Sequence, residues 1–260
     1  MRLLAAVRLA RLLPCFAAGF VVACLFGTLA PAARRRLVSL WCRAVLWALG
    51  VRIRCSGESV AGPALVVANH VSWLDILAIA ARTPAIFVCK SEIAAWPAIG
   101  WLLRRVGTIF IRRGSLRDVL RVNDELRLRL ARGETVAAFP EGTTTDGSLV
   151  LPFRPALFQP AADRAVPVVP VALSYSSPAA AYVGDTSFFR CLLAIAGERH
   201  LEVEAAFLAP HPVLDGRKRA AARAREAVVQ HARLARLIRP IRRAKAGAFD
   251  LAIAAAARQR

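Results

Sequence analysis

Residues 64–75 read ALVVANHVSWLD, a short apolar run followed by polar residues and then by a helix-like segment. The valine-rich run at 64–68 is typical of a buried strand, since such strands are short and bounded by turn residues. Ser72 with Asp75 three positions later is a box-like helix start, with Ser72 as the N-cap. The chain therefore changes from strand to helix between His70 and Asp75, so Asp75 in the first turn can fold back toward His70.

The same strand-to-helix alternation continues along the chain. Helix-length segments lie near 73–82, 92–105 and 115–132, and the last of them has the apolar stripe of an amphipathic surface helix. Alternation of this kind predicts an α/β fold with a mostly parallel central sheet flanked by helices. In such sheets, functional residues gather in loops at the carboxyl ends of the strands. The other predicted strands are 86–89, 108–111, 135–139, 166–173 and 201–207.

The pair His70 and Asp75 fits general-base chemistry. A carboxylate that binds one imidazole nitrogen fixes the tautomer, and the other nitrogen is then free to accept a proton. The carboxylate also stabilises the imidazolium that forms. Spacing alone leaves a structural alternative, in which Asp75 only caps the helix and His70 is a loop histidine bound to backbone groups.

Three further segments carry polar or unusual residues within or after predicted strands. FPEGTTT at 139–145 offers backbone amides, hydroxyls and one carboxylate in a tight turn, which suits a polar headgroup of the glycerol type. The arginines that close GTIFIRR at 107–113 could bind a phosphate bidentately. An ordinary turn and a solvated arginine pair are the alternatives. The prolines of VPVVPV at 166–171 suggest an edge or bulged strand that shapes a pocket, or else plain core.

Composition limits the class of protein. The 260 residues are 57% hydrophobic and carry a formal net charge of +20, which favours a membrane segment and a polyanionic partner. Anionic lipid and nucleic acid both fit that charge, but no helix-turn-helix, zinc or aromatic-stacking motif supports nucleic acid. The 6 cysteines form neither a CxxC pair nor a Cys/His cluster with metal-ligand spacing. We therefore expect membrane lipids as partners, and neither nucleic acid nor a metal.

The N-terminal region predicts a membrane-embedded helix or helical hairpin. Residues 12–33 carry no charge and are long enough to span the hydrocarbon core of a bilayer. The stretch 37–51 contains Trp41, Arg43 and Trp47, and it is predicted as an interfacial helix or half-hairpin. Basic residues are in excess after 12–33, so the bulk of the chain is expected on the cytoplasmic side of a bacterial-type inner membrane. A cleaved signal peptide is the alternative.

Four segments together resemble the glycerolipid acyltransferase family, which includes the 1-acylglycerol-3-phosphate (lysophosphatidic acid) acyltransferases. They are N-H-x-x-x-x-D at 69–75, G-x-x-F-I-x-R at 107–113, F-P-E-G-T at 139–143 and the V-P-V strand, in that order. The resemblance implies transfer of a fatty acyl group from acyl-CoA or acyl-carrier protein to a lysolipid hydroxyl. The acceptor implied first is the sn-2 hydroxyl of 1-acylglycerol-3-phosphate, which would give phosphatidic acid. The thioester is then a substrate, and no cofactor is required.

The resemblance also implies roles for individual residues. His70 would be the general base and Asp75 its orienter. A second set of residues would bind the acceptor: an arginine would contact its headgroup, and the Glu-Gly-Thr turn would line the acceptor site. These substrate-binding residues are Arg113, Glu141, Gly142, Thr143 and Lys90.

One position departs from the family pattern. Thr144 stands where the family usually has arginine after Glu-Gly-Thr. The phrase FPEGTTTDG…LPFR resembles the branch that acylates lyso-ornithine lipids, whose acceptor has no phosphate, so the acceptor stays open. A bound phosphate would otherwise rest on Arg113 and Arg154.

These predictions divide the chain into three parts. They are an anchor with an interfacial helix at 1–55, an acyltransferase catalytic domain at 56–215 and a basic helical tail at 216–260. The tail suits either a solvated basic face or a second contact with anionic headgroups. A membrane-anchored hydrolase or thioesterase, which would activate water with the same His/Asp pair, is the competing enzyme class. No G-x-S-x-G elbow is present to support a serine nucleophile.

Overall fold

A central sheet organises the structure, a computed structural model that describes residues 2–112 and 114–234. Within these residues the sheet has seven strands in the order β1-β7-β6-β2-β5-β3-β4. The strands from β6 to β4 are all parallel, whereas β7 runs antiparallel to β6, and β1 is parallel to β7. The predicted α/β fold with a mostly parallel sheet flanked by helices is therefore confirmed.

The elements follow the predicted alternation closely. The strands are β1 (Val51–Ser56), β2 (Leu65–Ala68), β3 (Ile86–Lys90), β4 (Ile109–Ile111), β5 (Val136–Ala138), β6 (Val168–Tyr175) and β7 (Leu201–Phe207). The α-helices are α1 (Arg2–Leu25), α2 (Pro31–Ala48), α3 (Leu74–Ala80), α4 (Ile99–Arg105), α5 (Leu116–Ala131), α6 (Gln159–Asp163) and α7 (Phe188–Gly197). Short 3₁₀ helices are η1 (Ser91–Ala95), η2 (Pro155–Phe158) and η3 (Pro178–Ala180), and residues 216–234 are also helical.

All the strands predicted from the sequence are present, and β1, α6 and α7 are additions. The β1 stretch VRIRCS alternates apolar residues with the charged Arg52 and Arg54. In the structure β1 is an edge strand with alternate residues exposed on one face of the sheet, and Arg54 pairs with Glu202 of β7 at 2.9 Å. Charges at alternate positions are expected in such a half-buried strand.

The VPVVPV stretch forms a central strand, so the expectation of an edge strand was wrong and the plain-core alternative holds. β6 lies between β7 and β2, and its residues from Val168 to Leu173 are buried. In a strand, the N–H and the C=O of one residue point to the same side. The Pro170 carbonyl accepts from the Leu208 N–H at 2.9 Å, so the N–H that Pro170 lacks would point toward the segment after β7 and not toward β2. The parallel pairing of β6 with β2 is therefore kept.

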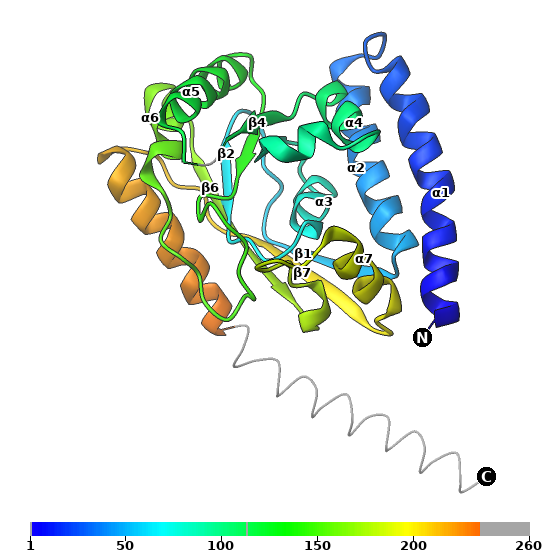
Figure 1. Cartoon of the computed structure of the whole chain (residues 1–260). Coiled ribbons are helices and arrows are strands. Elements are labelled where there is room, and N and C mark those ends of the chain that lie inside the picture. The colour runs from blue at the N-terminus through cyan, green and yellow to red at the C-terminus, as the bar shows by residue number, and fades with distance from the viewer. Residues whose placement is uncertain (1, 113, 235–260) are drawn as a thin grey trace, which may run out of the picture.

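Helices cover both faces of the sheet (Figure 1), and they enclose two hydrophobic clusters. On one face, α2, α3 and α7 bury large side chains such as Leu46, Leu74 and Ile195. On the other face, α5, α6 and the helix at 216–234 pack around Phe158. The sheet is thus the middle layer of a three-layer α/β arrangement.

The N-terminal region forms a helical hairpin, as predicted. The apolar stretch 12–33 is divided between two helices, because α1 ends at Leu25 and α2 begins with Pro31, a residue suited to the first turn of a helix. Trp41 of α2 donates its indole N–H to the Cys15 carbonyl of α1 at 2.8 Å. Among the described residues α1 is the one helix long and apolar enough to cross a bilayer.

Candidate active site

Parallel strands bring the predicted motifs to one edge of the sheet. β2 ends before His70, β5 ends before the Glu-Gly-Thr turn, β3 ends at Lys90 and β4 ends before Arg112. These strands are neighbours in the order β2-β5-β3-β4. Residues from four separate parts of the sequence therefore converge at one edge because parallel strands share the position of their carboxyl ends.

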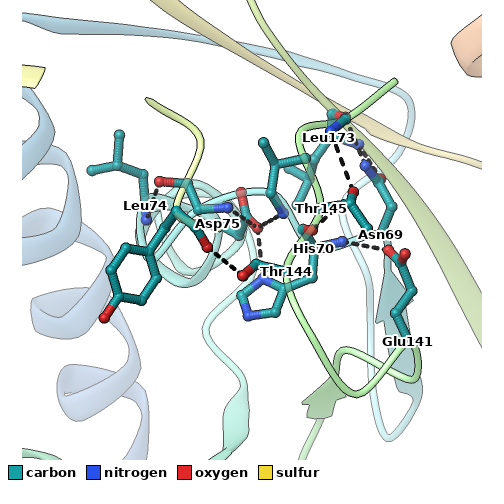
Figure 2. A network of polar contacts seen from close by, with 12 residues as sticks. Asn69, His70, Leu74, Asp75, Glu141, Thr144, Thr145 and Leu173 are labelled. Carbon is teal, nitrogen blue, oxygen red and sulfur yellow. Dashed lines mark hydrogen bonds and ion pairs between the residues drawn. The ribbon is translucent and has the colours of Figure 1, made fainter. Parts of the chain in front are cut away.

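His70 and Asp75 are in direct contact across the strand-to-helix turn (Figure 2). His70 Nδ1 lies 2.8 Å from Asp75 Oδ2, and this oxygen also accepts from the Val71 and Ser72 N–H groups at 2.7 and 2.9 Å. The predicted fold-back of Asp75 is therefore confirmed. The N-cap is one residue later than predicted, at Trp73, and Ser72 Oγ accepts from the Leu74 N–H at 3.3 Å.

Tyr175 also binds Asp75, which the sequence did not predict. Tyr175 is the last residue of β6. Its hydroxyl donates to Asp75 Oδ1 at a distance of 2.5 Å. Burial, followed by the charge of Asp75, raises the pKa of Tyr175 well above 10. The hydroxyl therefore stays protonated and remains a donor, and the signal that could have revealed it is a tyrosine ending a buried strand, whose O–H needs a partner.

Asn69 fixes the loop that carries His70. Its side-chain amide donates to the Leu173 carbonyl at 3.0 Å, and its side-chain oxygen accepts from the Leu173 N–H at 2.8 Å. Both ends of the buried amide are therefore satisfied by one residue of β6 (Figure 2). These two hydrogen bonds extend the contact between β2 and β6 by one residue beyond the end of β2. The next residue, His70, therefore lies just past the carboxyl ends of the parallel strands.

The Glu-Gly-Thr turn holds the main chain of His70 from both sides. Glu141 Oε1 accepts from the His70 N–H at 2.7 Å, and the Thr145 N–H donates to the His70 carbonyl at 2.8 Å. The other oxygen, Glu141 Oε2, accepts from the Leu151 N–H at 2.8 Å. Burial raises the pKa of Glu141, while the two N–H groups favour its charged form. The described contacts of this carboxylate are thus with the protein backbone.

The imidazole of His70 faces a cavity, while Asp75 lies beneath it. The His70 side chain is 12% exposed and that of Asp75 is 0% exposed. Phe139 stacks on the imidazole with a centroid distance of 4.0 Å and an angle of 13°. With Nδ1 bound to the carboxylate, Nε2 is the nitrogen available to a ligand.

A cavity of about 1200 Å³ joins this polar site to the N-terminal hairpin. His70, Thr143 and Arg154 line its polar part, and Phe16 and Trp41 line the part formed by α1 and α2. A large cavity with apolar walls and a few polar groups at one end suits an amphipathic ligand.

Three of the other predicted binding residues line the same cavity, whereas the buried Glu141 is not among its lining residues and Arg113 lies outside the described residues. The three are Lys90, Gly142 and Thr143. Lys90 pairs with Glu92 at 2.9 Å near the surface. Gly142 has φ +74°, and a Cβ there would lie 2.8 Å from Arg154 Nε, so the turn brings this guanidinium against its backbone.

Comparison with known proteins identifies the family. A family model described as Acyltransferase matches residues 52–174, which include every motif described above. Over 185 residues the chain is 37% identical to a 1-acyl-sn-glycerol-3-phosphate acyltransferase of Neisseria gonorrhoeae, covering 68% of this chain and 72% of that protein. The chain belongs to this acyltransferase family.

Other members of the family extend the comparison. A lyso-ornithine lipid O-acyltransferase of Pseudomonas aeruginosa is 45% identical over 142 residues, and the match spans 55% of each chain, about half the length of that relative. The crystal structure of the 1-acyl-sn-glycerophosphate acyltransferase PlsC from Thermotoga maritima matches with a TM-score of 0.64 and 20% identity. It covers 88% of this chain and 98% of that one, which supports the shared fold.

Proposed function

We propose that this acyltransferase-family chain moves a fatty acyl group from acyl-CoA or acyl-carrier protein to a hydroxyl of a lysolipid. The observation that carries the proposal is the His70 imidazole, which faces the cavity with Nδ1 held 2.8 Å from a fully buried Asp75 carboxylate. That contact leaves Nε2 as the base. Relatives named for lysolipid acceptors support the same reaction.

The proposed reaction is a direct transfer in two proton steps. Nε2 of His70 takes the proton of the acceptor hydroxyl while that oxygen attacks the thioester carbonyl carbon. The C–O bond forms, the tetrahedral intermediate collapses, and the C–S bond breaks. The imidazolium then returns its proton to the thiolate that leaves. Positioned proton transfer contributes on the order of 10²–10⁴-fold, and neither a metal nor a bound cofactor takes part.

The acceptor that we propose first is 1-acylglycerol-3-phosphate, acylated at sn-2 to give phosphatidic acid, with lyso-ornithine lipid as the alternative. The Thr144 hydroxyl donates to the Tyr182 carbonyl, so it is engaged with the protein backbone. Arg154 lies against Gly142 and lines the cavity, so it places a cation beside this turn. A guanidinium binds phosphate or carboxylate bidentately, so Arg154 suits the headgroup of either acceptor.

We further propose that the hairpin rests in one leaflet of the inner membrane. Arg8 of α1 is buried and donates to the Ala196 carbonyl at the end of α7 at 3.2 Å. At the other end of α1, Arg105 donates to the Ala23 carbonyl at 3.1 Å. Because both ends of α1 are bonded to the catalytic domain, the helix lies along that domain. Its exposed Leu13 can then enter a leaflet, as in a monotopic protein.

Basic residues near the α1–α2 turn support contact with the cytoplasmic leaflet. Arg35 and Arg36 are exposed on the first turns of α2, and Arg104 is exposed at the end of α4. Anionic lipids attract basic residues by about 1 kcal/mol each near the surface. In this arrangement the lysolipid enters the cavity of the active site from the leaflet that the chain contacts.

The test offers the purified chain one labelled thioester together with lysophosphatidate and lyso-ornithine lipid in parallel, and identifies the products by mass. We expect acylated lysolipid, and we expect His70→Ala to lose transfer while His200→Ala, at an exposed histidine, keeps it. Free fatty acid as the main product would instead identify a hydrolase. Near-normal transfer by a folded His70→Ala protein would falsify the base assignment.

A further inference from the structure

We propose that Arg225, on the helix at 216–234, is a positioning residue for His70. It acts through the peptide group between Val150 and Leu151 and then through the Glu141 carboxylate. This inference rests on the proposed acyl transfer for its kinetic effect. The contacts themselves lie partly outside residues 52–174, which the family model matches.

The helix at 216–234 packs against the catalytic domain through a buried face, which fixes the position of the Arg225 side chain. Its residues Ala221, Ala224 and Val228 are buried in the same hydrophobic cluster as Val150 and Phe153. The packed face therefore lies next to the segment that follows the Glu-Gly-Thr turn. A polar side chain at the margin of that face meets backbone groups of this segment.

Arg225 makes that contact with its guanidinium. Nη2 donates to the Val150 carbonyl at 2.7 Å, and Nε lies 3.2 Å from the same oxygen and 3.0 Å from the Leu151 carbonyl. Nearby arginines behave differently, since Arg219 and Arg223 are exposed and reach Asp215 only at 3.8 and 3.9 Å. Arg225 is half-buried and is directed at the main chain.

The peptide group between Val150 and Leu151 is held at both of its polar ends. Arg225 binds its carbonyl oxygen, and Glu141 Oε2 accepts from its N–H at 2.8 Å. A cation on the carbonyl polarises the peptide and strengthens the N–H as a donor. The two charged side chains therefore reinforce each other through this one peptide.

The second oxygen of Glu141 completes the connection to the base. Oε1 accepts from the His70 N–H at 2.7 Å, so the carboxylate joins the peptide between Val150 and Leu151 to the loop of His70. Rotation of that peptide would draw Glu141 away from His70. Because misplacement of a catalytic group by about 1 Å can reduce the rate about 10²-fold, even a partial shift would lower kcat.

The kinetic test compares Arg225→Ala and Arg225→Lys with Arg223→Ala, a matched exposed arginine on the same helix. We expect Arg225→Ala to lower kcat about 10-fold with little change in KM, because positioning and not binding is lost. The lysine variant should recover part of kcat, and Arg223→Ala should match the wild type. Unchanged kcat in a folded Arg225→Ala protein would overturn the proposal.

A double-mutant cycle tests the route through Glu141. If Arg225 acts through that carboxylate, its substitution should cost little more once Glu141→Gln is present, so the two effects on kcat are less than additive. Fully additive effects would show that Arg225 acts elsewhere and would reject the route.

Hydrogen exchange separates this inference from the proposed function. In Arg225→Ala, the amides of Leu151 and His70 should exchange faster than in the wild type, as measured with fragment-resolved mass spectrometry, while Arg223→Ala should leave them unchanged. Faster exchange in a chain with no acyl transfer would support the contacts and reject the function. Unchanged exchange at both amides would reject the contacts, whatever the activity.

Discussion

The hydroxyl of Tyr175 donates to Asp75 Oδ1 at 2.5 Å, although the two residues are 100 positions apart in the chain. The opposite oxygen of the carboxylate binds His70 and two backbone N–H groups. Asp75 is completely buried, so each of these bonds acts in a medium of low polarity, where hydrogen bonds to a charge are strong. The orientation of His70 therefore depends on a residue at the end of β6.

Tyr175→Phe should lower kcat about 10-fold with KM nearly unchanged, equivalent to roughly 1.4 kcal/mol of transition-state stabilisation. Without this donor Asp75 Oδ1 loses its Tyr175 partner, so the buried carboxylate is held less firmly in the orientation that positions the imidazole of His70. The measurement is kcat and KM of both proteins under the same conditions.

The thermal unfolding temperature and KM separate positioning from a general loss of structure. Partial unfolding would lower the thermal unfolding temperature together with the rate. We therefore expect an unfolding temperature and a KM close to those of the wild type together with a lower kcat. A wild-type kcat in the folded variant would contradict the role of Tyr175.

Asp75→Asn should retain the fold and lose most of the activity. The amide oxygen can take the Oδ2 position and accept from the three neighbouring donors, while the NH₂ group faces Tyr175, whose hydroxyl oxygen can accept. The charge that stabilises the imidazolium is gone, so kcat should fall on the order of 10²–10⁴-fold. Single-turnover rates with a labelled thioester measure this. A loss below about threefold would assign Asp75 to helix capping alone.

The sequence predicts the parts of this site that are local and misses those that depend on tertiary contacts. Asp75 lies five positions after His70, so a turn between strand and helix suffices to bring them together. Tyr175 and Arg225 reach their partners from 100 and about 75 positions away, and no local pattern marks them. The parallel order of the strands explains why the separate motifs converge, and that order too is a tertiary property.

Glu141→Gln should change how stability depends on pH. Burial raises the pKa of Glu141 above 4.5, its ordinary value, so the folded state favours the protonated form. Stability from this group is present below about pH 4.5 and is lost as the pH rises through the folded pKa. The unfolding free energy of the glutamine variant minus that of the wild type should therefore increase as the pH rises from about 4.5 through the raised pKa of Glu141. Denaturant titrations at several pH values measure it, and a flat difference would contradict the raised pKa.

Gly142→Ala should weaken acceptor binding more than it weakens the fold. At φ +74° an alanine is strained by about 1 kcal/mol, and its Cβ would lie 2.8 Å from Arg154 Nε and displace the guanidinium. We expect KM for the lysolipid to rise several-fold with kcat largely kept. Gly216→Ala, at φ +79° with no atom within 4 Å of the added Cβ, is the control for backbone strain. Equal KM values in the two variants would remove Arg154 from the acceptor site.

Leu13→Glu should detach the chain from membranes without affecting chemistry in detergent. Leu13 on α1 is 72% exposed, and a carboxylate there would face the leaflet that the hairpin is proposed to enter, where a charge is costly. Leu116→Glu is the matched control, because Leu116 is 74% exposed but lies on α5, which covers the opposite face of the sheet (Figure 1). In flotation with vesicles of mixed zwitterionic and anionic lipid, Leu13→Glu should remain in the soluble fraction and Leu116→Glu should float. Equal flotation of both variants would place the membrane contact elsewhere than on this face of α1.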